Sequence, residues 1–307
     1  MKRRLFALLT SLSMATMVTG CGVASSRAEE PKEPPSPPAS AHRVERAVAE
    51  KAFDLLGELA QAWEDRDCAA VDRLTAWAEN ALGGRACEVT RNGRPALTGY
   101  TDLEYLLPEA PDWFAVLARR PEPTYFLFVY DRNWRLAAGP LRILGEAPER
   151  ADGASASAST ARRAKLVPQR HLTYLTDTAG VSGIAFPPGD AIADLRDELV
   201  GRPATARPDR VSVDVELFGG PFRALALSNG SMLVFHSLRL VSRHRPGAGR
   251  AALSRPPYGR AQVKEFTGES QPATLTGTEL VVLASEISSK NRLTTVALRR
   301  AIADLTT

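Results

Sequence analysis

Residues 113–119 read Trp-Phe-Ala-Val-Leu-Ala-Arg, and residues 124–130 read Thr-Tyr-Phe-Leu-Phe-Val-Tyr. Both runs are rich in aromatic and β-branched residues, a composition that favours strands. Arg132 and Asn133 predict a turn, and residues 134–144 predict a third strand with Gly139-Pro140 as a bulge or break. This part of the chain is therefore expected to form an antiparallel sheet.

Helices are predicted before this sheet. Between residues 43 and 64, apolar side chains recur at spacings of three and four, which is typical of one long amphipathic helix. Asp67 is suited to cap a second helix that continues through Trp77, and Gly83-Gly84 is expected to end it in a turn. Helices packed on a curved antiparallel sheet give an α+β fold.

The C-terminal half repeats the theme. Asp190 is expected to cap a short helix through Val200, and residues 211–217 alternate as a half-buried strand does. Asn229-Gly230 predicts a hairpin between residues 223–227 and 231–241.

The chain end is ambiguous. Residues 280–283 predict a strand, whereas residues 293–305 fit either a strand or a helix. Their Ala and Arg content favours a helix; Thr294, Thr295 and Val296 favour a strand, which we adopt.

Two α+β domains are thus expected. The first covers residues 41–147 and the second covers residues 171–307, and the small, polar segment at 148–170 is read as a linker. The helix followed by Arg66-Asp67, a second short helix and a meander resembles the cone-shaped nuclear-transport-factor-like or cystatin-like folds. That resemblance implies two tandem cones, in which a curled sheet can enclose a pocket.

Residues 1–20 have the pattern of an export signal. Lys2, Arg3 and Arg4 precede an apolar run of about fourteen residues, and Val18-Thr19-Gly20 is a small-residue cleavage site before Cys21. This site resembles a bacterial lipoprotein signal, which implies a diacylglyceryl anchor with palmitate-type chains on Cys21, at the outer face of the cell membrane. An ordinary secreted protein or an uncleaved anchor are the alternatives.

The segment after the anchor is predicted to be a tether. Prolines recur among Ser, Ala, Glu and Lys in residues 21–40, as in disordered or polyproline-like linkers. Extended, such a tether spans on the order of 50 Å.

Charge and composition narrow the classes of partner. The chain carries a formal charge of +4, of which three positive charges lie in residues 1–20, so the remaining 287 residues are close to neutral and nucleic acid is not an expected partner. An apolar content of 44% can support a real core. No later segment reaches the length of a membrane span.

Two cysteines remain after Cys21. In an exported chain, Cys68 and Cys87 are expected to form a disulfide, worth roughly 3 kcal/mol on a chain-entropy argument. Two separate buried thiols are the alternative. A redox or nucleophilic role is not expected, since neither belongs to a Cys-x-x-Cys pair or has a neighbouring histidine.

Catalytic and metal-binding motifs are missing from the sequence. His42, His171, His236 and His244 show no spacing typical of a metal site, and nucleophile elbows and phosphate-binding loops are absent. We therefore expect no catalytic residues, no metal and no cofactor. Within residues 233–237, strand alternation would turn His236 inward, as a hydrogen-bonded core histidine or, alternatively, as a base.

The most suggestive polar feature is a stretch without Asp or Glu from Leu217 to Lys264. It predicts a positive surface that could meet anionic lipid headgroups or wall polymers. The alternative is a solvated, Pro- and Gly-rich loop at 243–259. The candidate residues for this surface are Arg239, Arg243, Arg245, Arg250, Arg255 and Arg260.

A family resemblance runs through most of the chain. It rests on Asp112-Trp113-Phe114, Val129-Tyr130-Asp131 to Trp134, the helix after Pro187-Pro188, and Ala224-Leu225 through Gly230 to Leu233-Val234-Phe235. Together these segments resemble a family of actinobacterial lipoproteins of unassigned function. The resemblance implies location and fold, and no activity.

Three functional hypotheses follow. The first is a non-enzymatic lipoprotein of the cell envelope that binds a small ligand or another envelope protein. The second is a hydrolase or isomerase with its active site in a cone pocket. The third is an envelope assembly factor that acts through the basic surface.

Overall fold

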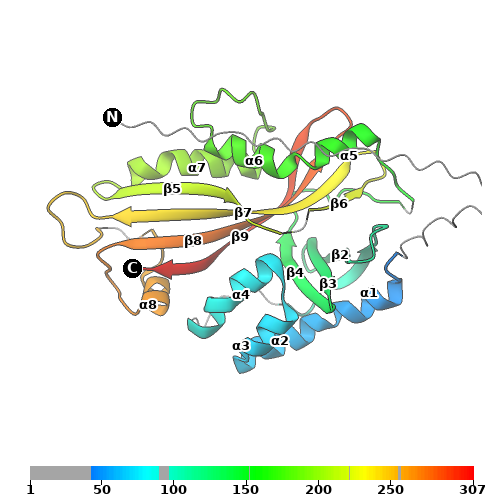
Figure 1. Cartoon of the computed structure of the whole chain (residues 1–307), viewed down its shortest axis with the longest axis horizontal. Coiled ribbons are helices and arrows are strands. Elements are labelled where there is room, and N and C mark those ends of the chain that lie inside the picture. Colours follow the sequence, from blue (N-terminus) through cyan, green and yellow to red (C-terminus); the bar gives the residue numbers. More distant parts are fainter. Residues whose placement is uncertain (1–42, 90–96, 152, 221, 255–256) are drawn as a thin grey trace, which may run out of the picture. The chain divides into compact units, whose positions relative to one another are not determined.

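Two antiparallel sheets form the framework of this computed structural model, which describes residues 43–89, 97–151, 153–220, 222–254 and 257–307 (Figure 1). The expected signal peptide, Cys21 and the tether lie outside these residues. The first sheet has the order β1 (Thr101–Leu106), β2 (Trp113–Arg120), β3 (Thr124–Asp131) and β4 (Asn133–Arg142). The second has the order β5 (Arg210–Leu217), β7 (Met232–Arg245), β8 (Leu275–Ile287) and β9 (Leu293–Thr306), and β6 (Arg223–Ala226) pairs with β7. The α+β class is as predicted.

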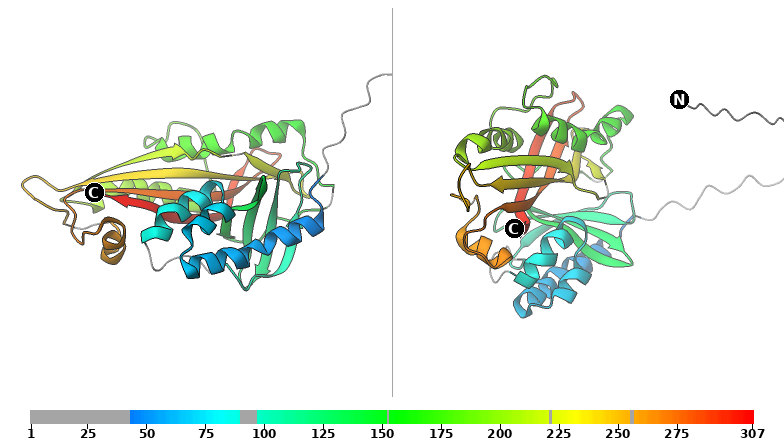
Figure 2. Two further views of the ribbon diagram at one scale, coloured as in Figure 1. Left: turned by 60° about the horizontal axis from the view of Figure 1, so that its bottom comes forward. Right: turned by 60° about the vertical axis from the view of Figure 1, so that its left-hand side comes forward.

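Helices cover the outer faces of both sheets (Figures 1 and 2). The first sheet packs on α1 (Arg46–Phe53), α2 (Leu55–Asp65) and α3 (Cys68–Leu74), whereas α4 (Trp77–Val89) lies against both β4 of the first sheet and β9 of the second. The second packs on α5 (Ala158–Ala164), α6 (Val167–Thr176) and α7 (Ala191–Thr205), and α8 (Arg260–Thr267) lies against the end of β9. The predicted helix at 43–64 is thus two helices that meet at Asp54.

Strand alternation explains how the second sheet contributes to a core on each of its two faces. On β7, Leu238 and Leu240 point toward α6 and α7, whereas Leu233 and Phe235 point toward β3 of the first sheet. Successive side chains of a strand lie on opposite faces, so one strand serves two layers of core. The cluster that includes Phe235 joins residues of both predicted domains, and residues 41–307 form one compact unit.

The first sheet contains the bulge expected at Gly139-Pro140. Leu127 pairs with Ala138 and Tyr125 pairs with Leu141, so two residues of β4 lie opposite Phe126. Gly139 has a φ of +143°, and a Cβ there would approach Phe126 Cδ1 to 2.7 Å. Glycine is therefore required at this position.

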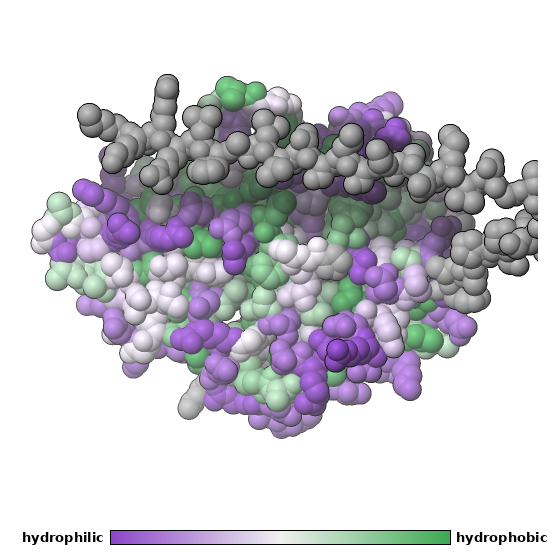
Figure 3. All heavy atoms as spheres, viewed as in Figure 1, coloured by the Kyte–Doolittle hydropathy of each residue, from purple (hydrophilic) through white to green (hydrophobic). Residues whose placement is uncertain are grey.

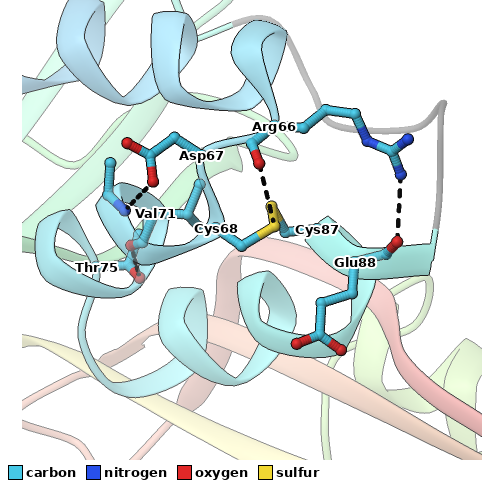
Figure 4. The surroundings of a disulfide bond; sticks show 8 residues. Arg66, Asp67, Cys68, Val71, Thr75, Cys87 and Glu88 are labelled. Atoms are coloured by element: carbon cyan, nitrogen blue, oxygen red, sulfur yellow. Dashed lines mark hydrogen bonds between the residues drawn. A yellow bond between two sulfur atoms is a disulfide. The ribbon is translucent and has the colours of Figure 1, made fainter.

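Gly83-Gly84 does not end a helix, contrary to the prediction. Both residues lie inside α4, where a Cβ at Gly83 would meet Val71 Cγ1 at 3.0 Å. The missing side chain at Gly83 allows α3 and α4 to approach closely. The Cys68–Cys87 disulfide joins the same two helices, with Cα atoms 5.6 Å apart (Figure 4). Asp67 caps α3 as predicted, because its Oδ1 accepts from the N–H of Ala70 at 2.9 Å.

Several elements were not foreseen from the sequence. Residues 158–164 and 167–170, which the sequence analysis assigned to the linker, belong to α5 and α6; Ser157 caps α5, and Ala164 and Val167 pack on β7. β1 and α8 were also missed. The strand chosen for residues 293–305 is confirmed as β9.

A buried ion pair connects the two sheets. Arg299 of β9 pairs with Glu79 of α4 and donates to the carbonyl of Gly139 at 2.6 Å. Glu79 also accepts the N–H of Gly139 at 3.2 Å. The two charged side chains are only 10% and 7% exposed. One pair thus fixes a helix, the bulge of β4 and a strand of the other sheet.

Breaking this pair should be costly, because the surviving charge stays buried. We expect Arg299→Met or Glu79→Met each to lower the free energy of unfolding by roughly 3–5 kcal/mol, measured by urea denaturation. The double variant should lose less than either single variant, since it leaves no isolated charge. Arg142→Met, which breaks an exposed pair with Glu122, is the control and should cost about 1 kcal/mol or less. Additive losses in the double variant would contradict this role.

Candidate functional site

A groove of about 1240 Å³ lies between the C-terminal half of α7, strand β9, the segment leading into α8, and the first sheet. This volume exceeds the roughly 300–1000 Å³ typical of small-molecule pockets. Its wall includes Asp197, Glu198, Gly201 and Arg202 of α7, residues 298–302 of β9, His244 of β7, Tyr258, Phe266 of α8, Glu279 of β8, and Tyr100, Glu122 and Arg142 near the first sheet.

A buried carboxylate organises one wall of the groove. Glu279 pairs with Arg300 through Oε2 and lies 3.4 Å from Arg202 through Oε1, which also accepts from the Tyr258 hydroxyl at 3.0 Å. Burial raises the pKa of Glu279, although the charge of Arg202 opposes this. Burial likewise raises the pKa of Tyr258, as does the neighbouring Glu279. Both carboxylate oxygens are occupied, so the network is a fixed wall.

Opposite charges neutralise one another around the groove. Glu198 bonds Arg202 and Arg300, each at 2.7 Å, and so closes a ring with Glu279. On the opposite side, Arg142 pairs with Glu122 at 3.2 Å. With Arg299 held by Glu79, each arginine of the lining has an acidic partner. The groove therefore presents little net positive charge, despite four guanidinium groups.

His244 lies in the same wall as a neutral ring. Burial, followed by the charge of Arg202, lowers its pKa to about 4. Its Nε2 atom is buried and has no hydrogen-bond partner among the described residues. Its ring centroid lies 6.4 Å from that of Tyr258.

A pair of histidines is buried outside the groove. His171 of α6 and His236 of β7 have ring centroids 4.7 Å apart. His171 Nδ1 is 3.0 Å from the carbonyl of Val167, whereas neither nitrogen of His236 has a hydrogen-bond partner in the described chain. His236 points inward as predicted, but the expected hydrogen bond is absent from the described structure. Burial lowers the pKa of His171 to about 4 and that of His236 well below its ordinary value.

The neighbouring strand β5 neutralises two of the six arginines of the predicted basic surface. Arg239 and Arg243 form ion pairs with Glu216 and Asp214 of β5, which runs antiparallel to β7. Arg245 lies opposite Arg210 in the same ladder, and Arg250 donates to Ser254 Oγ. Arg260 begins α8, and Arg255 lies outside the described residues. Hydrophilic and hydrophobic side chains are interspersed on the face shown in Figure 3.

The sequence contains a signal for the groove that hydrophobic periodicity does not detect. Glu279 precedes the apolar run 280–284, and Arg299-Arg300 follows the largely apolar run 296–298. Charged residues next to strongly apolar strand segments require partners. Which partners they find depends on strand register and on α7, and the sequence did not reveal either.

Within the described ranges, no helix is long and apolar enough to cross a membrane, and no cluster of three or more His, Cys, Asp or Glu residues is placed to hold a metal. Comparisons with family models, with curated proteins and with solved structures found no match to this chain. The resemblances inferred from the sequence therefore stay predictions.

Acid should destabilise the fold through the buried histidines. Because their folded-state pKa values lie below the ordinary value of 6.5, the folded protein binds fewer protons than the unfolded chain. Stability should be complete above about pH 6.5 and decline as the pH falls toward 4. Between pH 7.5 and 5.0, His171 alone should account for roughly 2 kcal/mol of the free energy of unfolding.

The variant His236→Leu separates this effect from general acid sensitivity. Since the ring nitrogens of His236 have no partners among the described residues, a leucine should change the stability at pH 7.5 by less than about 1.5 kcal/mol. The loss on acidification, measured by urea unfolding at both pH values, should be smaller than in the wild type. Some loss remains, because His171 and His244 still titrate. Equal losses in the two proteins would refute the assignment.

Proposed function

We propose that this protein is a lipid-anchored lipoprotein of the cell envelope whose globular unit binds a ligand or another envelope protein in the groove and catalyses no reaction. The observation that carries the proposal is the groove itself, with its fixed and charge-balanced wall. The pattern of residues 1–21 supports the anchor, and the proline-rich segment to residue 40 supports a tether.

The bonds already made by Glu279 and Tyr258 favour binding over catalysis, and the Nε2 atom of His244, which has no partner among the described residues, is shielded from solvent. A general acid or base must be within reach of a substrate proton, with a lone pair or proton to exchange. Glu279 directs its two oxygens to Arg202, Arg300 and Tyr258, and the Tyr258 hydroxyl also contacts Ser242 Oγ at 2.9 Å. These groups stiffen the wall, and a stiff wall suits recognition.

The anchor is tested at Cys21. The wild-type protein should fractionate with membranes, and its N-terminal peptide should carry the added mass of a diacylglyceryl group on Cys21. Cys21→Ser should release the protein from the membrane fraction, as judged by immunoblotting. An unmodified Cys21 in a membrane-bound protein would contradict the proposal.

The groove is tested by filling it. Gly201 lies in α7 on the groove wall, and a Cβ there meets no atom within 4 Å. Gly201→Trp should therefore obstruct the groove without disturbing the fold. Native mass spectra of protein purified from its own membranes should show a retained ligand in the wild type and much less in this variant.

Gly57→Trp is the matched control. Gly57 is an exposed position of α2 that is also free of atoms within 4 Å of a Cβ, and it does not line the groove. This variant should retain ligand as the wild type does. Equal retention in all three proteins would place the ligand elsewhere.

A further inference from the structure

β9 is an edge strand whose outer side is paired at one end. Its inner side pairs with β8 from Leu293 to Thr306. On the outer side, Ala297 bridges to Ile143, and the N–H of Leu144 donates to the carbonyl of Val296 at 2.9 Å. Among the described residues, no strand pairs with the outer side of β9 beyond this bridge.

The open part of this edge faces the groove. Five consecutive residues, 298–302, line the groove, and all five are half-buried. Consecutive side chains of a strand point to opposite faces, so a groove lined by an unbroken run of residues borders the edge of the strand. The backbone N–H and C=O groups of alternate residues point toward that edge.

An unpaired strand edge offers a row of backbone donors and acceptors, and an extended backbone is their natural complement. The run 298–302 spans about 13 Å at the rise of a β-strand. A groove of about 1240 Å³ can hold a peptide strand of this length with its side chains.

We propose that the groove receives an extended peptide segment of a partner envelope protein, which pairs with residues 298–302 of β9 and extends the second sheet by one strand. The inference rests on the proposed function, and it names the chemistry of the ligand. Backbone hydrogen bonds would supply affinity, and the alternate side chains of the peptide would contact the α7 wall and the first sheet.

The charges of the groove favour a peptide over a polyanion. A nucleic acid or an anionic wall polymer needs cations that are free to pair with it. Here Arg142, Arg202 and Arg300 already have carboxylate partners at the groove, and exposed Asp197 adds a negative charge.

The shape of the groove disfavours a second copy of this chain. Besides the β9 edge, the groove is lined by Gly201 and Arg202 of α7, by Phe266 of α8, and by Glu122 and Arg142 near the first sheet. A single strand fits in such a groove, whereas the edge of a folded sheet brings its own covering helices with it.

The probe is a library of random seven-residue peptides displayed on phage. It is selected on the full-length lipoprotein in detergent and counter-selected on Gly201→Trp. Peptides enriched on the wild type are synthesised and titrated by fluorescence anisotropy. We expect Gly57→Trp to bind them as the wild type does and Gly201→Trp to bind at least about 10-fold more weakly.

Backbone methylation then tests the mode of binding. N-methylation at alternate positions of a selected peptide should weaken binding at least about 10-fold, whereas methylation at the intervening positions should change it about 3-fold or less, because an edge pairs with every second residue. Hydrogen exchange should slow at the amides of residues 298–302 when the peptide is bound.

Three results of the peptide experiments would overturn the inference. In the first, selection enriches no peptide that binds the wild type better than Gly201→Trp. In the second, binding tolerates N-methylation at every position of the peptide. In the third, hydrogen exchange at residues 298–302 is slow without peptide and depends on protein concentration. The last result would identify a second copy as the occupant. A non-peptide mass retained in the wild type and lost in Gly201→Trp would preserve the proposed function and refute the peptide.

Discussion

The buried pair between Glu79 and Arg299 is the constraint on which the arrangement of the two sheets depends. A guanidinium group this well shielded from water is stable only where its donors are satisfied. Its donors reach the carboxylate of α4 and the carbonyl of Gly139, which the β4 bulge turns toward it. The bulge in turn requires glycine, because a side chain there would strike Phe126. A helix, a bulge and a strand of the other sheet are therefore positioned together.

Arg300, the residue after Arg299 in β9, connects this junction to the groove. Because β9 alternates, Arg299 enters the interface between the sheets while Arg300 points to the other face, where it bonds Glu279 and Glu198. Arg299 thus fixes the first sheet against the second, and Arg300 fixes α7 against β9. A change in the register of β9 by one residue would exchange the two roles and leave both arginines without their partners.

The sequence predicted those features that depend on short-range chemistry. The strands predicted at 113–119 and 124–130, the Asp67 and Asp190 caps, and the hairpin at Asn229-Gly230 each follow from residues that are neighbours in the chain. The groove could not be predicted from the sequence, because the residues that pair in its wall, such as Glu198 and Arg300, are far apart in the chain. The turn predicted at Gly83-Gly84 was wrong for the same reason: Gly83 lies inside α4, where it allows close approach to Val71, a residue that is distant in the sequence.

The acid-free stretch from 217 to 264 shows that charge must be judged in space. Strand pairing places Glu216 opposite Arg239, so β5 supplies the acids that β7 lacks. The same neutralisation at the groove removes the long-range field that would attract polyanions, and the edge of β9 at residues 298–302, which pairs with no other strand among the described residues, still offers backbone donors and acceptors there. Open edges invite association with other chains. Because this edge borders a groove that α7, α8 and the first sheet also line, an isolated strand reaches it more easily than the edge of another folded sheet does, which is the basis of the peptide ligand that we propose.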